Sequence, residues 1–125
     1  MFRSLVCALL LIAVAPSAFA HARLVRSSPG KGDALPNAPE RIELWFSELL
    51  DDGFNSIEIF PASEIAAPKR ANLAKEKPAL DPRDRTHLSL KTAPLAPGEY
   101  VVEWRVLSRD GHSAPGRFTF RISDR

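Results

Sequence analysis

Sulfur is almost absent from this chain of 125 residues. The single cysteine is Cys7 and the single methionine is Met1, and both lie within the first 20 residues. Without that segment, the chain has no thiolate or thioether ligand and forms no disulfide. A metal site in it must therefore use nitrogen and oxygen ligands. The domain must also be stabilised by its hydrophobic core, which about 100 residues can provide.

The chain also lacks a large excess of charge of either sign. Seventeen Lys and Arg stand against fifteen Asp and Glu, and the one charged residue of the first 20 is Arg3, so residues 21–125 carry a net charge near +1 (16 minus 15). A nucleic-acid-binding face would require clustered basic residues. We therefore expect no nucleic-acid partner.

The first 20 residues have the pattern of a secretory signal peptide. They have a basic start, an apolar run over residues 5–14 and the small-residue ending Ala18-Phe19-Ala20. The run is short for a bilayer, which needs about 20 apolar residues, so an uncleaved membrane anchor is the weaker alternative. We predict a signal peptide at 1–20, export to the periplasm, and one domain at 21–125 that begins with His21.

Short stretches of alternating apolar residues are spaced along the rest of the chain, with Pro- and Gly-rich turns between them and no stretch typical of a helix. The expected strands are residues 22–26 (at a sheet edge), 41–46, 55–60, 86–90, 99–107 and 117–123. Residues 61–82 read as a long connection, with a strand around Leu73 as an alternative. Six or seven strands predict an all-β fold, an immunoglobulin-like Greek-key β-sandwich (a cupredoxin-like barrel or sandwich).

The apolar residues of these strands recur at every second position, so we expect them to share the inward face of the sandwich. They are Ile42, Leu44, Phe46, Ile57, Ile59, Leu88, Leu90, Tyr100, Val102, Trp104, Val106, Phe118, Phe120 and Ile122.

Cleavage after Ala20 would make His21 a candidate metal ligand. An unperturbed α-amine has a pKa of about 7.7–8.0, so a metal ion can displace its proton near neutral pH. The amine and the imidazole Nδ1 of one residue then close a six-membered chelate ring, which loses less entropy than two separate ligands. The alternative is that histidine stands first by chance, because cleavage always leaves some residue there.

A second pair of donors is Asp110-Gly111-His112. In an extended strand, residues two apart project to the same face, so Asp110 and His112 would converge. The alternative is a hairpin turn, since Asp-Gly between two alternating runs is the strongest short hairpin signal. Both interpretations can hold together, because loop tips commonly present ligands.

One amine, two imidazoles and one carboxylate predict a Cu(II) site. Nitrogen and oxygen donors in a tetragonal arrangement favour Cu(II), whereas Zn²⁺ prefers a tetrahedral site and Cu(I) would require sulfur. The third histidine, His87, lies in an alternating run next to Leu88, so we expect a surface strand residue rather than a ligand. Glu48 reads either as a solvated carboxylate or as a partner that hydrogen-bonds a metal ligand.

Four motifs together resemble the CopC family of copper resistance proteins, over all of residues 21–122 except the Pro- and Lys-rich middle. The motifs are His21-Ala22-x-Leu24-Val25-x-Ser27-x-Pro29-x-x-Gly32, Ile42-Glu43-Leu44-x-Phe46-Ser47-Glu48, Gly98-x-Tyr100-x-Val102-x-Trp104-Arg105-Val106-x-Ser108-x-Asp110-x-His112, and Gly116-x-Phe118-x-Phe120. The start and the Trp-to-His segment are specific in combination.

The resemblance implies a periplasmic Cu(II)-binding β-sandwich whose metal site falls on His21, Asp110 and His112, with Glu48 near the metal. Many relatives also bind Cu(I) through a Met-rich loop that corresponds to about residues 60–80, where this chain has no methionine. A transporter partner of the CopD type would be a separate inner-membrane chain. We expect the protein to be a monomer.

Three functions fit these observations. The first is a Cu(II) carrier or buffer in copper homeostasis or resistance, which is not an enzyme. The second is a copper-dependent oxidase or monooxygenase using the same N-terminal histidine, as in the similar lytic polysaccharide monooxygenases. The Asp carboxylate would leave less room for oxygen, and aromatic residues make up only 8% of the chain, too few to predict a flat sugar-binding surface. The third is a structural sandwich domain without a metal.

Overall fold

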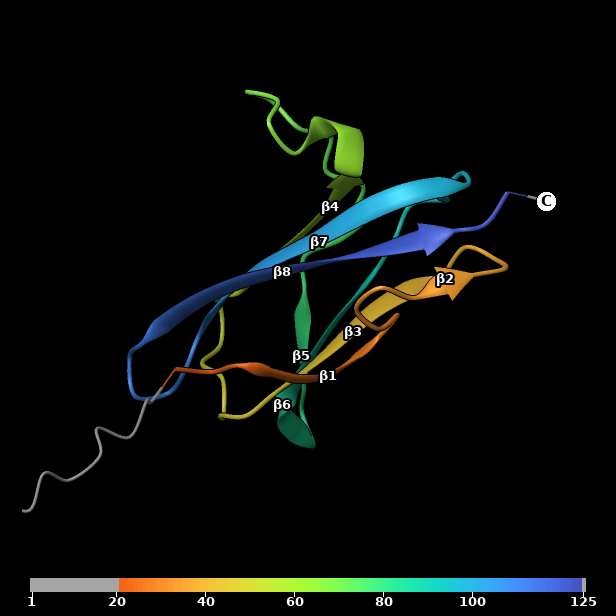
Figure 1. Ribbon diagram of the computed structural model, residues 1–125. Coiled ribbons are helices and arrows are strands. Elements are labelled where there is room, and N and C mark those ends of the chain that lie inside the picture. The colour runs from red at the N-terminus through yellow and green to blue at the C-terminus, as the bar shows by residue number, and fades with distance from the viewer. Residues whose placement is uncertain (1–20, 125) are drawn as a thin grey trace, which may run out of the picture.

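The computed structural model describes residues 21–124 as two four-stranded β-sheets packed face to face (Figure 1). The signal peptide expected at residues 1–20 lies outside the described residues. The strands are β1 (Leu24–Ser28), β2 (Ala34–Leu35), β3 (Arg41–Phe46), β4 (Ser56–Pro61), β5 (Ala79–Asp81), β6 (Asp84–Lys91), β7 (Gly98–Leu107) and β8 (Ser113–Ile122). One sheet has the order β1-β3-β6-β5 and the other β2-β8-β7-β4. The predicted β-sandwich is confirmed.

The core lies between the two sheets and follows from the alternation along each strand. Every residue expected on the inward face is buried, and the strongest predicted strand, β7, pairs with β8 over its whole length from Gly98↔Ile122 to Leu107↔Ser113. β1 is an edge strand, as expected, although it begins two residues later than predicted. Within residues 21–124, no helix is long and apolar enough to cross a membrane.

Two short strands were not predicted, which gives eight strands instead of six or seven. β2 has two residues and pairs with β8 in parallel, and β5 has three residues and pairs with β6. Segments of this length contain too few residues to show alternation. The alternative strand around Leu73 is wrong, since only an isolated bridge between Ala74 and Thr92 forms there.

The long connection after β4 covers the outer face of the β2-β8-β7-β4 sheet. It begins with a short 3-10 helix, Ala62–Glu64, and lies above β4 and β7 in Figure 1. Phe60 and Val101, which pair across β4 and β7, are fully buried outside the cluster between the sheets. The Arg70 guanidinium stacks over the Phe60 ring at 4.3 Å. This connection therefore adds a second, smaller buried layer.

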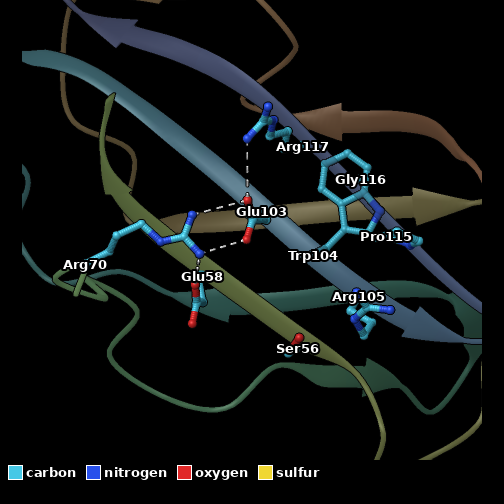
Figure 2. Close-up of a pocket in the computed structure, with 9 residues that line it drawn as sticks. All are labelled: Ser56, Glu58, Arg70, Glu103, Trp104, Arg105, Pro115, Gly116 and Arg117. Atoms are coloured by element: carbon cyan, nitrogen blue, oxygen red, sulfur yellow. Dashed lines mark hydrogen bonds and ion pairs between the residues drawn. The ribbon is translucent and has the colours of Figure 1, made fainter. Parts of the chain in front are cut away.

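Arg70 also neutralises two carboxylates that face each other across β4 and β7. Glu58 pairs directly with Glu103, and like charges in that position destabilise a sheet. The guanidinium lies 3.1 Å from Glu103 Oε1 and 3.5 Å from Glu58 Oε2, and Arg117 of β8 lies 4.0 Å from Glu103 (Figure 2). One side chain thus holds the connection against the sheet by charge and by stacking.

Candidate metal centre

Three interactions fix the start of the described chain at one end of the sandwich. Ala22 is buried in the core. The next residue, Arg23, donates its backbone N–H to Ser47 Oγ at 3.1 Å and accepts the Ser47 N–H at 2.9 Å. His21 directly precedes these two anchored residues and is exposed. The imidazole is therefore attached to a part of the backbone that has little freedom to move.

The Asp110-Gly111-His112 segment is the turn between β7 and β8. Gly111 has a φ of +91°, a left-handed conformation that glycine adopts without strain. Its N–H donates to the Ser108 carbonyl at 2.9 Å, and the Ser108 N–H donates to the His112 carbonyl at 3.0 Å. The hairpin interpretation is confirmed. Convergence through an extended strand is wrong, because the turn itself brings Asp110 and His112 together.

The fold brings His21 and His112 together from opposite ends of the domain. Their ring centroids are 5.4 Å apart with an interplanar angle of 64°, and Figure 1 shows the first described residues beside the β7–β8 turn. A hollow of about 450 Å³ adjoins His21 and is lined by residues 21–24, residues 113–115 and Trp104. Two imidazoles are thus within reach of one small ligand.

Asp110 completes the pair on the turn. Its Oδ1 accepts hydrogen bonds from the Ser108 hydroxyl and from the His112 backbone N–H at 3.3 Å, and it lies 3.2 Å from His112 Nδ1. The hydrogen bond from Ser108 is the main cause that holds the pKa of the Asp110 carboxyl below its ordinary value of 3.8; desolvation opposes it, and the contacts with His112 lower the pKa further. Asp110 is therefore a carboxylate at neutral pH.

Glu48 lies on the segment after β3, which contacts both the start of the described chain and the β7–β8 turn. Ser47 before it is bonded to Arg23, and the Leu49 carbonyl after it accepts the Arg109 N–H at 3.0 Å. The side chain of Glu48 is half-buried. The two residues that flank Glu48 thus contact the segment that carries His21 and the turn that carries Asp110.

His87 has Trp45 and two carboxylates as its neighbours, and the expectation of a surface strand residue is only partly correct. It lies on the outer face of the other sheet with its side chain only 14% exposed. Its ring stacks on Trp45 at 4.2 Å, while Nε2 lies 3.4 Å from Glu43 Oε1 and Nδ1 lies 3.5 Å from Asp81 Oδ2. These two carboxylates face opposite ring nitrogens, so they do not form one chelate with the imidazole.

The donor atoms at the His21 end suit a metal ion with nitrogen and oxygen ligands, provided that one more donor is present. Asp110 Oδ1 and His112 Nδ1 lie 3.2 Å apart, close to the separation of about 2.9 Å expected for two adjacent ligands that are each about 2.0–2.1 Å from one ion. Within residues 21–124, however, no group of three or more His, Cys, Asp and Glu side chains could hold a metal ion. A centre at this end therefore needs a further donor besides these side chains.

Ser108 entered our sequence analysis only as part of a family motif, with no role at this site. It is buried, although serine is usually exposed, and its hydroxyl contacts Asp110. Its alternation with the apolar residues of β7 at Trp104 and Val106 was the available signal, since a residue in that register is expected to face inward.

Known proteins of similar sequence and structure share this fold. The CopC domain matches residues 24–123. Protein YobA of Escherichia coli (strain K12) is 35% identical over 110 residues, which are 87% of this chain and 84% of YobA. The crystal structure of CopC from Methylosinus trichosporium OB3b has a TM-score of 0.72 and 30% identity, covering 82% of this chain and 94% of that one.

A further solved structure is PcoC from Escherichia coli, described as a methionine-rich copper resistance protein. It has a TM-score of 0.67 and 30% identity, and covers 83% of this chain and 100% of its own. The present chain differs in having Met1 as its single methionine. The domain match extends from the start of β1 to one residue beyond β8. The chain belongs to the CopC family.

Proposed function

We propose that this chain is a periplasmic Cu(II)-binding protein that acts as a carrier or buffer in copper homeostasis or resistance. The metal would be held by the amine and imidazole of His21 together with Asp110 and His112. The observation that carries this proposal is the 5.4 Å separation of the His21 and His112 rings, with Asp110 bonded to His112 beside them.

The chemistry of the donors supports copper in its oxidised form. Nitrogen and oxygen donors suit Cu(II), which also has the highest affinity in the divalent series. Cu(I) favours thiolates and thioethers, and residues 21–125 contain neither cysteine nor methionine. The name of PcoC, a copper resistance protein, agrees with this choice of metal. We therefore do not propose a separate Cu(I) site.

Export would generate the fourth donor. Removal of residues 1–20 as a signal peptide would turn the peptide nitrogen of His21 into a free amine, which can then bind together with the imidazole of the same residue. An amide nitrogen in the uncut chain lacks that basic lone pair. Copper binding in this proposal is thus restricted to the processed protein, which is the form in the periplasm.

Glu48 is proposed to hydrogen-bond the ligand set rather than to bind the metal. Its neighbours in the chain contact both the segment that follows His21 and the Asp110 turn, and partners that orient metal ligands commonly contribute to affinity. We further propose a monomer that exchanges copper with a separate inner-membrane transporter of the CopD type.

The test is a Cu(II) titration of two purified forms, followed by electron paramagnetic resonance (EPR). One form begins at His21 and the other carries a single additional glycine in front of it. We expect tight binding only in the first form, because the glycine turns the His21 amine into an amide. Equal affinities and equal EPR spectra would contradict the N-terminal chelate.

The same two forms test the alternative of a copper-dependent oxidase or monooxygenase. With ascorbate as reductant, the form that begins at His21 should produce little peroxide in comparison with an established monooxygenase at the same copper loading. Comparable peroxide production would favour the enzymatic alternative.

A further inference from the structure

The side chain of Ser108 is the buried hydroxyl closest to the proposed ligands. Within residues 21–124, the buried polar or charged residues are Ser108, 2% exposed, and Thr92, 8% exposed. A buried hydroxyl without a hydrogen bond is costly. Ser108 Oγ contacts Asp110 Oδ1 and lies 3.1 Å from the His112 carbonyl oxygen. Both of its partners thus belong to residues of the proposed copper site.

The single hydroxyl proton can be donated to only one of these two acceptors at a time. Asp110 is ionised and the His112 carbonyl is neutral, and hydrogen bonds to charged acceptors are roughly twice as strong. The His112 carbonyl already accepts the Ser108 backbone N–H at 3.0 Å. The Ser108 hydroxyl therefore donates its proton mainly to the Asp110 carboxylate.

The Asp110 side chain needs such a partner, because little else restrains it. It is 44% exposed and the His112 side chain is 53% exposed. The other contacts of its carboxylate are with the backbone and ring of His112, at 3.3 and 3.2 Å. An exposed carboxylate held only by an exposed imidazole would sample several rotamers.

We propose that Ser108 is a positioning residue of the copper site, whose buried hydroxyl holds the Asp110 carboxylate beside His112 so that both can bind one ion. This inference rests on the proposed Cu(II) function. It assigns a role to a residue that is not itself a ligand. Ser108 directly follows strand β7, which ends at Leu107 and is paired with β8 up to that residue.

The backbone of Ser108 makes this role separable from the closure of the turn. Its N–H and C=O bond to His112 and Gly111, and Ser108→Ala keeps both of those groups. Ser108→Ala therefore removes the hydroxyl while the turn retains its main-chain hydrogen bonds.

The experiment is a double-mutant cycle on the protein that begins at His21, with Ser108→Ala, Asp110→Ala and the combination of both. Cu(II) affinity is measured by chelator competition and the copper environment by EPR. We expect Ser108→Ala alone to weaken Cu(II) binding about tenfold or more, as is typical when a partner of a metal ligand is lost, and to alter the EPR spectrum. In the Asp110→Ala background, Ser108→Ala should change the affinity less than about twofold, because its target is gone.

Two further measurements keep a folding defect apart from the positioning role. Thr92→Val is the matched control, since it removes the other buried hydroxyl, which donates to the Pro39 carbonyl at 3.0 Å and lies beyond the far end of β6. It should lower the denaturation midpoint but leave copper affinity and EPR unchanged. In the metal-free protein, NMR order parameters of residues 109–112 should fall in Ser108→Ala and stay unchanged in Thr92→Val.

The inference is overturned if Ser108→Ala binds Cu(II) with the affinity and EPR spectrum of the unsubstituted protein. It is also overturned if Ser108→Ala lowers the Cu(II) affinity by the same factor in the presence and in the absence of the Asp110 side chain. Ser108 would then act on the turn and not on the carboxylate. A failure of the proposed function looks different, because the unsubstituted protein itself would then bind no Cu(II), or would bind it equally with an additional N-terminal glycine.

Discussion

The indole ring of Trp104 occupies the space that a side chain at Gly116 would need. The two residues pair across β7 and β8, and a Cβ atom on Gly116 would lie 2.3 Å from Trp104 Cζ2. The ring cannot easily move aside, because it packs against Phe46 and Phe118 with centroid distances of 6.0 and 5.8 Å. Trp104 also lines the hollow beside His21, so this close packing reaches the candidate metal centre.

We predict that Gly116→Ala lowers the free energy of unfolding by about 1–3 kcal/mol, the usual cost of overpacking a core. Urea denaturation of the metal-free protein measures it. The control is the same substitution in a Trp104→Leu background, where the smaller side chain leaves room for the new methyl group and the further loss should be smaller. Equal losses in both backgrounds would show that the ring is not the cause.

A second prediction concerns the guanidinium between Glu58 and Glu103. Arg70→Met should lower the free energy of unfolding by about 1 kcal/mol, because two carboxylates are left facing each other and a cation–π contact with Phe60 is lost. The effect should shrink at high salt, which screens the repulsion. Lys69→Met, which removes one positive charge from the neighbouring exposed position, should have little effect. A loss as large as that of Arg70→Met would contradict a specific role of the Arg70 guanidinium between the two carboxylates.

Alternation predicted the long strands because each has enough residues to show a period of two and one face in the core. It did not predict that Phe60 and Val101 are also buried, since their burial depends on a connection that has no periodic pattern of its own. The same limit explains the two missed strands. β2 is ordered by its pairing with β8, a contact between distant parts of the chain, and not by a local preference.

The candidate site was predictable as a set of donors and not as an arrangement. Histidine and aspartate at positions 21, 110 and 112 are visible in the sequence, and Asp-Gly correctly indicated a turn. Their proximity depends on the pairing of β1 with β3 and on the anchoring of Arg23 by Ser47. Alternation along β7 indicates that Ser108 faces inward, but its contact with Asp110 becomes visible only when the turn is folded.

A third prediction concerns stability in acid. The hydroxyl and backbone N–H of Thr86 donate to Asp84 Oδ1 at 2.6 and 3.1 Å, and these hydrogen bonds lower the pKa of the Asp84 carboxyl below its ordinary value of 3.8. Since the folded pKa lies below the unfolded one, the ionised carboxylate stabilises the fold fully above about pH 4, and this contribution is lost as the pH falls through the folded pKa.

Asp84→Ala should therefore be less stable than the unsubstituted metal-free protein at pH 7, and the difference should decrease as the pH is lowered below 3.8. Urea denaturation between pH 7 and pH 2.5 measures both curves. Thr86→Val, which removes only the hydroxyl donor, should weaken the same pH dependence. A stability difference that stays constant over this whole range would rule out the ionised carboxylate as its source.

The last prediction separates the acid sensitivity of copper binding from the charge of Asp110. In the protein that begins at His21, Cu(II) affinity should fall as the pH is lowered from about 7 to about 5, because the amine and the imidazoles must lose protons to bind. Asp110 contributes nothing to that slope, since its pKa lies below 3.8 and it stays ionised throughout. Chelator competition at several pH values therefore gives two independent quantities, a slope and an absolute affinity.

Asp110→Asn should lower the affinity at every pH by at least about tenfold and change the EPR spectrum, while the slope stays the same. Asp84→Ala, which removes a carboxylate on β6, should alter neither quantity. A reduced affinity with an unchanged EPR spectrum would mean that Asp110 acts on His112 from outside the ligand set. A changed slope would mean that Asp110 exchanges a proton during binding, which a carboxylate with a lowered pKa does not do in this pH range.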